Sequence, residues 1–292
     1  MLRTRFRLLL ISLASILAAT ARPALGAEPL RINGSTTVNP VVVDAADLFR
    51  AETGSTVFVD TQGGSSGGIA ALGEGRAEIG MISRELEPDD RTKFPQVKFQ
   101  ATRIGTDALA LVVSKDVWAG GVKVLSRSQM QGIYEGRTTN WKALGGPDRR
   151  IVFFNKEPGR GTWEAFAKWL YGDPKKAPVV SFPEVGANEE GRNKVSSTRG
   201  ALSQLSAAWA DGKTVFALAI RRDDGKVVPP TTAAIADGSY PIARPLQVVT
   251  NGAPQGLAKG MIDLLLSPRG QALVTRHGYL PLAPASAKKR IP

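Results

Sequence analysis

LRINGSTTVNPVVVDAADLFRAETGSTVFVDTQGGSSGG, residues 30–68, carries the pattern that decides the fold. A first strand is expected near residues 30–33 and leads into the turn Gly34-Ser35-Thr36-Thr37, and apolar residues then recur at helical spacing over 39–53. The continuous apolar run 56–59 predicts a buried strand, which ends in the Gly- and Ser-rich turn 63–68. Because a short helix is expected after this turn as well, two strand–turn–helix units follow one another directly.

The rest of the chain continues the alternation of strands and helices. Further strands are expected at 78–83, 108–113, 150–154 and 214–220. Further helices are expected at 126–134, 163–170 and 255–266, and from 268 up to Gly278, with Ser126 and Gln129 forming a capping box. The stretch 172–213 has no clear pattern. This alternation predicts an α/β fold with a mainly parallel sheet.

Three turns of the predicted fold share one device, in which Gly, Ser and Thr join a strand to the start of a helix. They are Gly34–Thr37, Gly63–Gly68 and Gly159–Thr162. Glycine lets the backbone approach a ligand closely, and the first N–H groups of each helix have no partner within that helix. Hydroxyl donors and the helix dipole add to this, so each turn favours an anion. The sequence therefore predicts an anion site at the carboxyl ends of the strands.

The first 27 residues have the three parts of a secretory signal. Arg3, Arg5 and Arg7 precede the apolar run 8–19, and the small-residue stretch 24–27 follows. The apolar run is too short to span a bilayer comfortably. We therefore expect a cleaved signal peptide at 1–27 and no stable membrane insertion.

Composition narrows the function classes further. The chain has no cysteine, which excludes disulfides, thiolate metal sites and a lipid anchor at the cleavage site, so a free periplasmic protein fits best. Without the four arginines of the signal segment, 34 basic residues face 26 acidic ones, a surplus of +8. These basic residues are scattered, apart from the tail run Lys288-Lys289-Arg290, and they are not interleaved with aromatic residues. No nucleic-acid partner is expected.

Several segments in order along the chain resemble the phosphate-binding subunits of bacterial phosphate ABC transporters, the PstS family. The resemblance covers nearly the whole mature chain. It is carried by GSTTV (34–38), GGSSG (63–67), IGMISREL (79–86), IGTDALA (104–110), QGIYEGRTTNWKALGG (131–146), DGSYPIARP (237–245), SPRGQ (267–271) and GYLPL (278–282).

The resemblance implies a two-lobed periplasmic-binding-protein fold of type II, with each lobe a mostly parallel sheet flanked by helices and the ligand cleft between the lobes. Lobe 1 is then expected to combine residues 28–108 and 230–292, and lobe 2 to comprise 109–229. The implied protein is a monomeric binding protein without a cofactor that delivers inorganic phosphate to the permease subunits of an ABC importer. The ligand-binding positions that it implies are Ser35, Thr36, Ser65, Ser66, Ser83, Arg84, Asp107, Lys156, Arg160, Gly161 and Thr162.

Two of these positions suggest how phosphate is told from sulfate. Phosphate keeps a proton near neutral pH and can donate it to a buried carboxylate, here Asp107, whereas sulfate cannot. A site that demands this hydrogen bond rejects sulfate by on the order of 10⁴-fold. Arg84 is expected to offset the charges of Asp107 and of the ligand. The alternative is a structural ion pair between Arg84 and Asp107 at the edge of the cleft.

Two positions depart from the family pattern. Lys156 stands where the family usually has arginine and loses the planar fork of that side chain, and Arg160 replaces a serine hydroxyl with a long cation. Because a buried arginine costs desolvation, Arg160 is expected to point outward.

Three other functions are considered: a serine hydrolase, a metal site and a binding module that serves no transporter. GSSGG (64–68) matches the nucleophile-elbow pattern G-x-S-x-G, but the single histidine, His277, is expected at a helix end, so no enzyme is predicted. Glu85, Glu87, Asp89 and Asp90 are expected to begin a solvated helix and not to bind a metal. An anion-binding sensor, adhesin or scavenger that serves no transporter shares the same site and remains the main alternative.

Overall fold

A computed structural model describes residues 28–283 of the chain. The expected signal peptide, 1–27, and the basic tail run Lys288-Lys289-Arg290 lie outside the described residues. Within 28–283, no helix is both long and apolar enough to cross a membrane.

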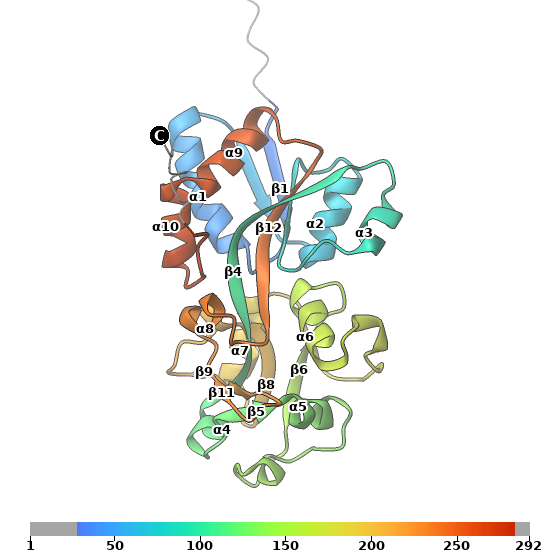
Figure 1. Cartoon of the computed structure of the whole chain (residues 1–292), viewed down its shortest axis with the longest axis vertical. Helices are drawn as coiled ribbons and strands as arrows, with labels where there is room; N and C mark the ends of the chain where they lie inside the picture. The colour runs from blue at the N-terminus through green and yellow to red at the C-terminus, as the bar shows by residue number, and fades with distance from the viewer. Residues whose placement is uncertain (1–27, 284–292) are drawn as a thin grey trace, which may run out of the picture.

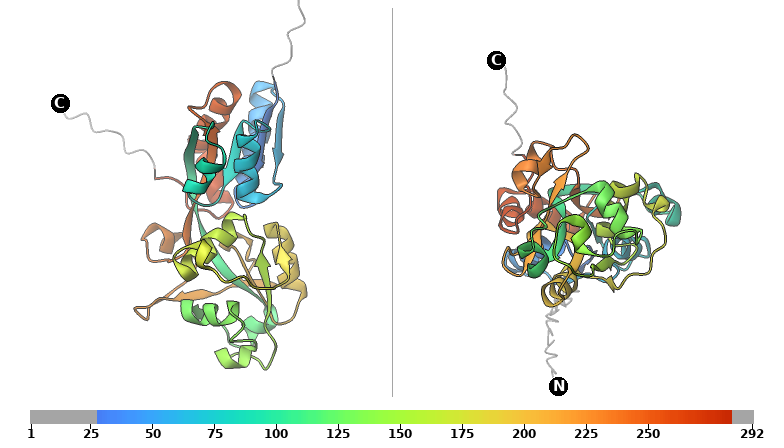
Figure 2. Two further views of the ribbon diagram at one scale, coloured as in Figure 1. Left: turned by 90° about the vertical axis from the view of Figure 1, so that its right-hand side faces the viewer. Right: turned by 90° about the horizontal axis from the view of Figure 1, so that it is seen from below.

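The elements form two lobes, one above the other in Figure 1, and the side view in Figure 2 shows the same division. The upper lobe holds β1 (Leu30–Gly34), α1 (Asn39–Thr53), β2 (Val57–Asp60), α2 (Gly64–Gly73), β3 (Ile79–Ile82), α3 (Pro88–Lys93), α9 (Gly256–Leu266) and α10 (Pro268–Arg276). The lower lobe holds α4 (Lys115–Ala119), β5 (Val124–Ser126), α5 (Arg127–Tyr134), β6 (Val152–Lys156), α6 (Gly161–Tyr171), β7 (Glu184–Val185), α7 (Asn188–Ser197), β8 (Ala201–Ser206), β9 (Val215–Ala217), β10 (Ala219–Arg221), β11 (Val227–Val228) and α8 (Thr232–Ala236). Short 3₁₀ helices lie at Trp141–Leu144, Pro174–Lys176 and Ala207–Trp209.

Two long strands, β4 (Phe99–Ser114) and β12 (Ala243–Asn251), run antiparallel through both lobes. They lie at the centre of one sheet with the order β2-β1-β3-β12-β4-β8-β6-β7, and β9 also pairs with β4. β1 pairs in parallel with β2 and β3, and β6 pairs in parallel with β7 and β8. The sheet is therefore mixed, because the strands that join the lobes run against their neighbours, whereas the sequence pattern predicted a mostly parallel sheet.

Each lobe has its own apolar core. In the upper lobe α1, α9 and α10 pack on β1, β3 and β12, with Val42, Met261 and Val274 fully buried. The core of the lower lobe is rich in aromatic side chains, among them Trp141 and Phe166. Burial of large apolar side chains is the main favourable term in folding, so each lobe is stabilised from within.

The chain returns to the upper lobe within β12. Ala234 of α8, Tyr240 and Ile242 all pack into the core of the lower lobe. The family resemblance implied that lobe 1 resumes at residue 230, and the segment after that residue buries its apolar side chains against the lower lobe as far as Ile242.

Local sequence signals account for several helix ends. The expected capping box of α5 is present: Ser126 Oγ accepts from Gln129 N at 3.1 Å, and Gln129 Oε1 accepts from Ser126 N at 2.8 Å. Ser267 caps α10 by accepting from Gly270 N at 3.2 Å, with Pro268 in the first turn.

Candidate anion-binding site

The first turn is held at the end of β1 by its serine. Ser35 Oγ accepts from the backbone N–H groups of Thr37 at 3.1 Å and Val38 at 3.4 Å, just before α1 begins. Gly34 has a φ of 140°, and a Cβ at this position would lie 2.2 Å from Met81 O. Only glycine fits this approach between the end of β1 and β3, which brings Ser35 to 3.0 Å from Ser83.

The second turn is shorter than the sequence pattern suggested, because α2 begins at Gly64. Gly63 and Gly64 both have positive φ, which places Ser65 in the first turn of the helix. Ser65 Oγ accepts from Ser83 N at 3.1 Å. Ser66 N donates to Gly159 O at 3.1 Å, so the start of α2 already touches the lower lobe.

The third turn meets the first two across the cleft. Gly161 and Thr162 form the start of α6, and both are buried. A Cβ on Gly161 would lie 2.4 Å from Ser65 Oγ and 2.8 Å from Ser83 Oγ. The two lobes are therefore in a closed arrangement in which position 161 accepts only glycine.

The start of a fourth helix, α7, also faces the cleft. Asn188, its first residue, is buried and donates from Nδ2 to Thr37 Oγ1 of the upper lobe at 2.9 Å. The segment before it is held by Lys156, whose Nζ donates to Gly186 O at 3.0 Å and Ala187 O at 2.8 Å. Sequence reasoning missed this contribution, since the helix lies in the stretch that showed no clear pattern.

A small cavity lies where these turns converge. Its volume is about 10 Å³, on the order of one water-sized probe, so the closed cleft holds only a small ligand group. Among the described residues it is lined by Ser35, Thr36, Thr37, Gly64, Ser65, Ser83, Arg160, Gly161, Thr162 and Gly186, and none of these is Asp or Glu. Backbone N–H groups at helix starts and hydroxyl groups dominate the lining, which is the composition that an oxyanion requires.

A larger open depression of about 510 Å³ runs along one face of α7. It is lined by residues of the α7 segment alone, including the carboxylates Glu189 and Glu190. Because no other element contributes a converging donor there, the small cavity between the lobes is the better candidate site.

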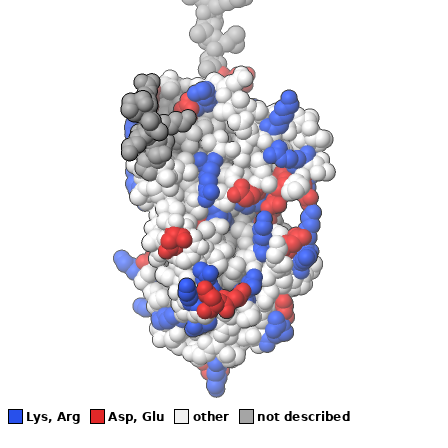
Figure 3. All heavy atoms as spheres, in the orientation of Figure 1, with Lys and Arg blue, Asp and Glu red and all other residues white. Residues whose placement is uncertain are grey.

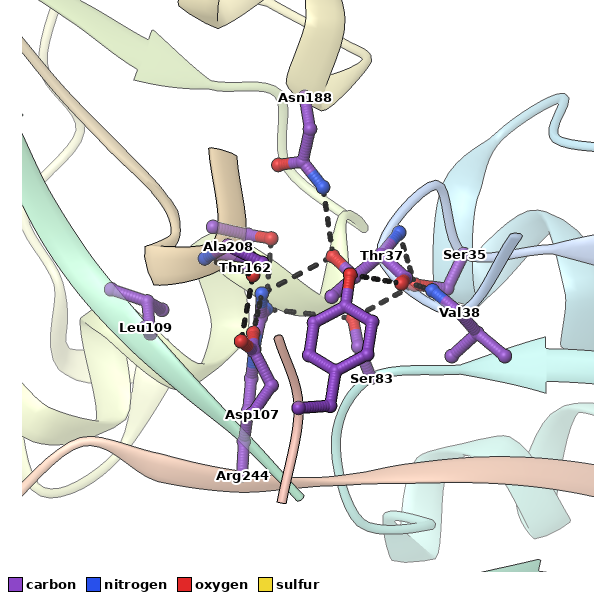
Figure 4. A network of polar contacts seen from close by, with 12 residues as sticks. Ser35, Thr37, Val38, Ser83, Asp107, Leu109, Thr162, Asn188, Ala208 and Arg244 are labelled. Atoms are coloured by element: carbon purple, nitrogen blue, oxygen red, sulfur yellow. Dashed lines mark hydrogen bonds and ion pairs between the residues drawn. The ribbon is translucent and has the colours of Figure 1, made fainter. Parts of the chain in front are cut away.

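Behind the cavity, Arg244 of β12 occupies the centre of a buried polar network (Figure 4). β12 pairs Arg244 with Asp107 of β4, and the guanidinium lies 2.8–2.9 Å from Asp107 Oδ2. Its other N–H groups donate to Thr162 Oγ1 at 2.8 Å, Thr37 Oγ1 at 3.2 Å and Ser83 Oγ at 3.4 Å. One arginine on a strand shared by both lobes thus contacts hydroxyl groups of each lobe.

Asp107 does not line the cavity. Oδ2 is taken by Arg244, and Oδ1 accepts from Ser206 Oγ at 2.7 Å. Complete burial raises the pKa of Asp107 above its ordinary value, against the opposing effects of Arg244 and Ser206. The carboxylate expected to take the ligand's proton is therefore the counter-ion of Arg244 instead.

Arg84 forms no ion pair with Asp107 and does not line the cavity. Its guanidinium donates to Asp90 of α3 at 2.6 and 2.9 Å and forms an ion pair with Glu164 of α6 across the lobe junction. Burial raises the pKa of Glu164, although Arg84 opposes this. Arg84 therefore does not form the ion pair with Asp107 that was the alternative from the sequence, and it does not line the cavity.

Both departures from the family pattern lie close to the cavity. Arg160 lines it and donates from Nε and Nη2 to Glu157 at 2.8 and 2.7 Å, with the side chain packed between Gly64 and Gly186, so it does not point outward as expected. Lys156 is fully buried behind Gly186. Burial, followed by repulsion from Arg160 and Arg244, lowers the pKa of Lys156 to about 7.

The structure thus brings together most of the residues that the sequence singled out. Seven of them line the cavity: Ser35, Thr36, Ser65, Ser83, Arg160, Gly161 and Thr162. Ser66, Arg84, Asp107 and Lys156 lie around it. Thr37 and Gly64 lie in two of the turns predicted to favour an anion, although they were not among the implied ligand contacts. Sequence reasoning missed Gly186, Asn188 and Arg244, and Arg244 lies in a segment that resembles the family but was given no role.

The serine hydrolase and the metal site considered from the sequence gain no support from these contacts. The ring of His277 lies 2.7 Å from Asp44 on α1, and Ser66 Oγ lies 3.5 Å from Glu164, so the nucleophile-elbow pattern has no base. Among residues 28–283 no group of acidic or imidazole side chains has the geometry to hold a metal ion. Asp90 of the acidic segment caps α3 and binds Arg84.

Two α/β lobes, joined by two long strands and closing on a small polar cavity, define a binding protein of the periplasmic type. The family model of the PBP superfamily domain matches residues 18–269. The chain is 32% identical over 261 residues to the phosphate-binding protein PstS of Bacillus subtilis, covering 87% of this chain and 80% of that one. The chain belongs to the PstS family of substrate-binding proteins, as the sequence motifs predicted.

Solved structures agree with this assignment. The chain is similar to a putative phosphate ABC transporter substrate-binding protein with bound phosphate from Clostridium perfringens, with a TM-score of 0.78 and 29% identity over 88% of this chain and all of that one. It is also similar to an ABC-type phosphate transport receptor from Vibrio cholerae, with a TM-score of 0.67 and 27% identity over 87% of this chain and all of that one. The predicted two-lobed fold of type II is confirmed.

Proposed function

We propose that this chain binds inorganic phosphate, or a closely related tetrahedral oxyanion, in the cavity between its lobes. The observation that carries the proposal is the convergence of helix starts from both lobes on one small cavity lined by hydroxyl groups and by no carboxylate among the described residues. Helix N-termini bind anions through free N–H groups and the helix dipole. The names of the relatives point to the same ligand.

Within this proposal the cavity-lining residues contact the anion directly. Ser35, Ser65 and Thr162 supply hydroxyl groups, Gly161 supplies the backbone at the start of α6, and Arg160 supplies a cation at the wall. Lys156 holds the segment that precedes α7. The hinge is formed by β4 and β12, near the level of Asp107 and Arg244.

The biological role that follows is capture of the anion outside the cytoplasm and delivery to the permease subunits of an ABC importer. The relatives carry the names of binding proteins and not of enzymes, and the separate contacts of Ser66 with Glu164 and of His277 with Asp44 fit a protein without catalysis. Export is supported by the tripartite N-terminal segment.

Thermal unfolding of the mature protein with added phosphate tests the binding proposal. A ligand that binds only the native state stabilises it by RT ln(1 + [L]/Kd), or about 2.7 kcal/mol at a hundredfold excess over Kd. We expect a concentration-dependent rise of Tm with phosphate and none with chloride. An unchanged Tm at millimolar phosphate would contradict the proposal.

A further inference from the structure

Of the described residues that line the cavity, Arg160 alone carries a charge. Its guanidinium has five N–H groups. Nε and one N–H of Nη2 donate to Glu157 Oε2 at 2.8 and 2.7 Å, and within residues 28–283 no protein atom accepts from the other three. Arg244 behind the cavity, by contrast, directs its N–H groups at Asp107 and at three hydroxyl groups. Of these two arginines, Arg160 is therefore the one with donors left for an anion.

The side chain of Arg160 occupies a slot between glycines of the two lobes. Gly64 begins α2 in the upper lobe, and a Cβ there would lie 2.6 Å from Arg160 Cδ. Gly186 precedes α7 in the lower lobe, and a Cβ there would lie 2.6 Å from Arg160 Nη2 and 3.0 Å from Glu157 Oε2. Gly64 has a positive φ but Gly186 does not, so the backbone at 186 would accept alanine. Room for Arg160 and Glu157 is thus the reason that position 186 requires glycine.

The two groups that flank the guanidinium are themselves fixed. Glu157 is 43% exposed and Arg160 17%, so the carboxylate holds the arginine from the solvent side. Gly186 is held by Lys156, which is buried outside the cavity lining and donates from Nζ to Gly186 O at 3.0 Å and Ala187 O at 2.8 Å. The two departures from the family pattern therefore meet at Gly186, since Lys156 holds its carbonyl group and Arg160 packs where its side chain would stand.

We propose that Glu157 and Gly186 are positioning residues of the anion site, which together direct the guanidinium of Arg160 at the anion, so that Arg160 and not Lys156 is the cation that contacts it. The inference rests on the proposed function of the same site. Because Arg160 packs against Gly64 of the other lobe, the guanidinium reaches this place only when the cleft closes. A charge-assisted hydrogen bond to the anion then strengthens binding by about tenfold or more.

A double-mutant cycle of Gly186→Ala and Arg160→Ser tests the positioning, by calorimetric titration of the mature protein with sodium phosphate in chloride buffer. The new methyl group displaces the end of a flexible side chain and no backbone atom, so the fold should persist. We expect Gly186→Ala to weaken phosphate binding about fivefold or more in the wild type, but less than about twofold in Arg160→Ser. Equal losses in the two backgrounds, or no loss in either, would overturn the inference and leave the proposed function intact. A wild-type protein that binds no phosphate would overturn both.

Glu157→Asp tests the same positioning without a change of charge. Its carboxylate is one methylene shorter and loses both hydrogen bonds from Arg160, so phosphate binding should weaken about threefold or more in the wild type and less than about twofold in Arg160→Ser. Glu135→Asp is the matched control, because Glu135 forms an ion pair with Arg137 in the lower lobe and does not line the cavity. If Gly186→Ala does not fold, Glu157→Asp in the two backgrounds decides. Wild-type affinity in Glu157→Asp, or an equal loss in Glu135→Asp, would overturn the inference.

Discussion

The ion pair between Arg84 and Glu164 joins the lobes outside the cavity, so Glu164→Gln should weaken ligand binding by making closure less favourable. Arg84 belongs to the upper lobe and is buried, with 5% of its side chain exposed, while Glu164 stands in the first turn of α6 in the lower lobe. Opening of the cleft separates the two. Arg84 keeps Asp90 as a partner in either state, so its charge is not left uncompensated.

The size of the effect follows from burial. A charge-assisted hydrogen bond contributes about 1.5–3 kcal/mol, and the glutamine retains a neutral part of it. A net loss of about 1–2 kcal/mol from the closed state lowers its population and raises the apparent dissociation constant by about 5–30-fold. Glu164→Gln also removes a negative charge near an anion site, which by itself strengthens anion binding. A control variant must therefore lose a negative charge in the same region.

The neighbouring pair of Asp89 and Lys175 provides that control. It also joins α3 to the lower lobe, at 2.8 Å, but its side chains are 57% and 72% exposed. Charged groups of both signs gather on the surface at the junction of the lobes in Figure 3. Exposed pairs contribute only about 0–1 kcal/mol, so Asp89→Asn should change phosphate affinity less than about fivefold. Calorimetric titration of both variants decides it: equal losses, or wild-type affinity in Glu164→Gln, would refute the reasoning.

Four shorter predictions concern the cavity and the N-terminus. Arg160→Ser should weaken phosphate binding about tenfold in a calorimetric titration, because Arg160 lines the cavity and only its Nε and Nη2 groups donate to Glu157. Equal or tighter binding in this variant would place the guanidinium outside the site. Gly161→Ala should weaken binding by tenfold or more without unfolding either lobe, seen as wild-type circular dichroism with a lost phosphate response, because its methyl group would overlap Ser65 Oγ. Burial lowers the pKa of Lys156 to about 7 in the folded protein, so between pH 7 and the ordinary lysine pKa near 10.4 the folded state binds fewer protons than the unfolded state. The free energy of unfolding should therefore rise with pH across that window by about 1 kcal/mol per pH unit. Denaturant titrations at several pH values should show this rise in the wild type and lack it in Lys156→Met. Intact mass of the protein exported from its host should place the mature N-terminus near Ala27, and a retained first methionine would contradict export by cleavage.

Local signals predicted the parts of the site that depend on local chemistry. The turn Gly34–Thr37 and the start of α6 could be read from the sequence, since a strand end, a glycine and hydroxyl groups lie within a few residues of one another. The capping box of α5 was readable for the same reason. Each of these features is formed by residues only a few positions apart, so it does not depend on how distant elements pack together.

Long-range pairings could not be read in this way. Which carboxylate meets Arg84 depends on the docking of α3 and α6, and which cation meets Asp107 depends on the register between β4 and β12. Both arginines carry the same charge, so residue type alone does not distinguish them. Asn188 was missed because the stretch around it has weak periodicity, since its helix buries only Gly191 and Val195 besides Asn188 itself.

The charges around the cavity largely cancel, and this explains why its hydroxyl groups matter. Arg244 is compensated by Asp107, and Arg160 is paired with Glu157, so neither pair brings a full net charge to the ligand. Lys156 carries only part of a charge near neutral pH because burial lowers its pKa to about 7. A dianion in this cavity is therefore held mainly by directed N–H and O–H groups, each of which requires a fixed geometry. Closure supplies that geometry, since the donors come from both lobes and meet only when Gly161 lies against Ser65 and Ser83.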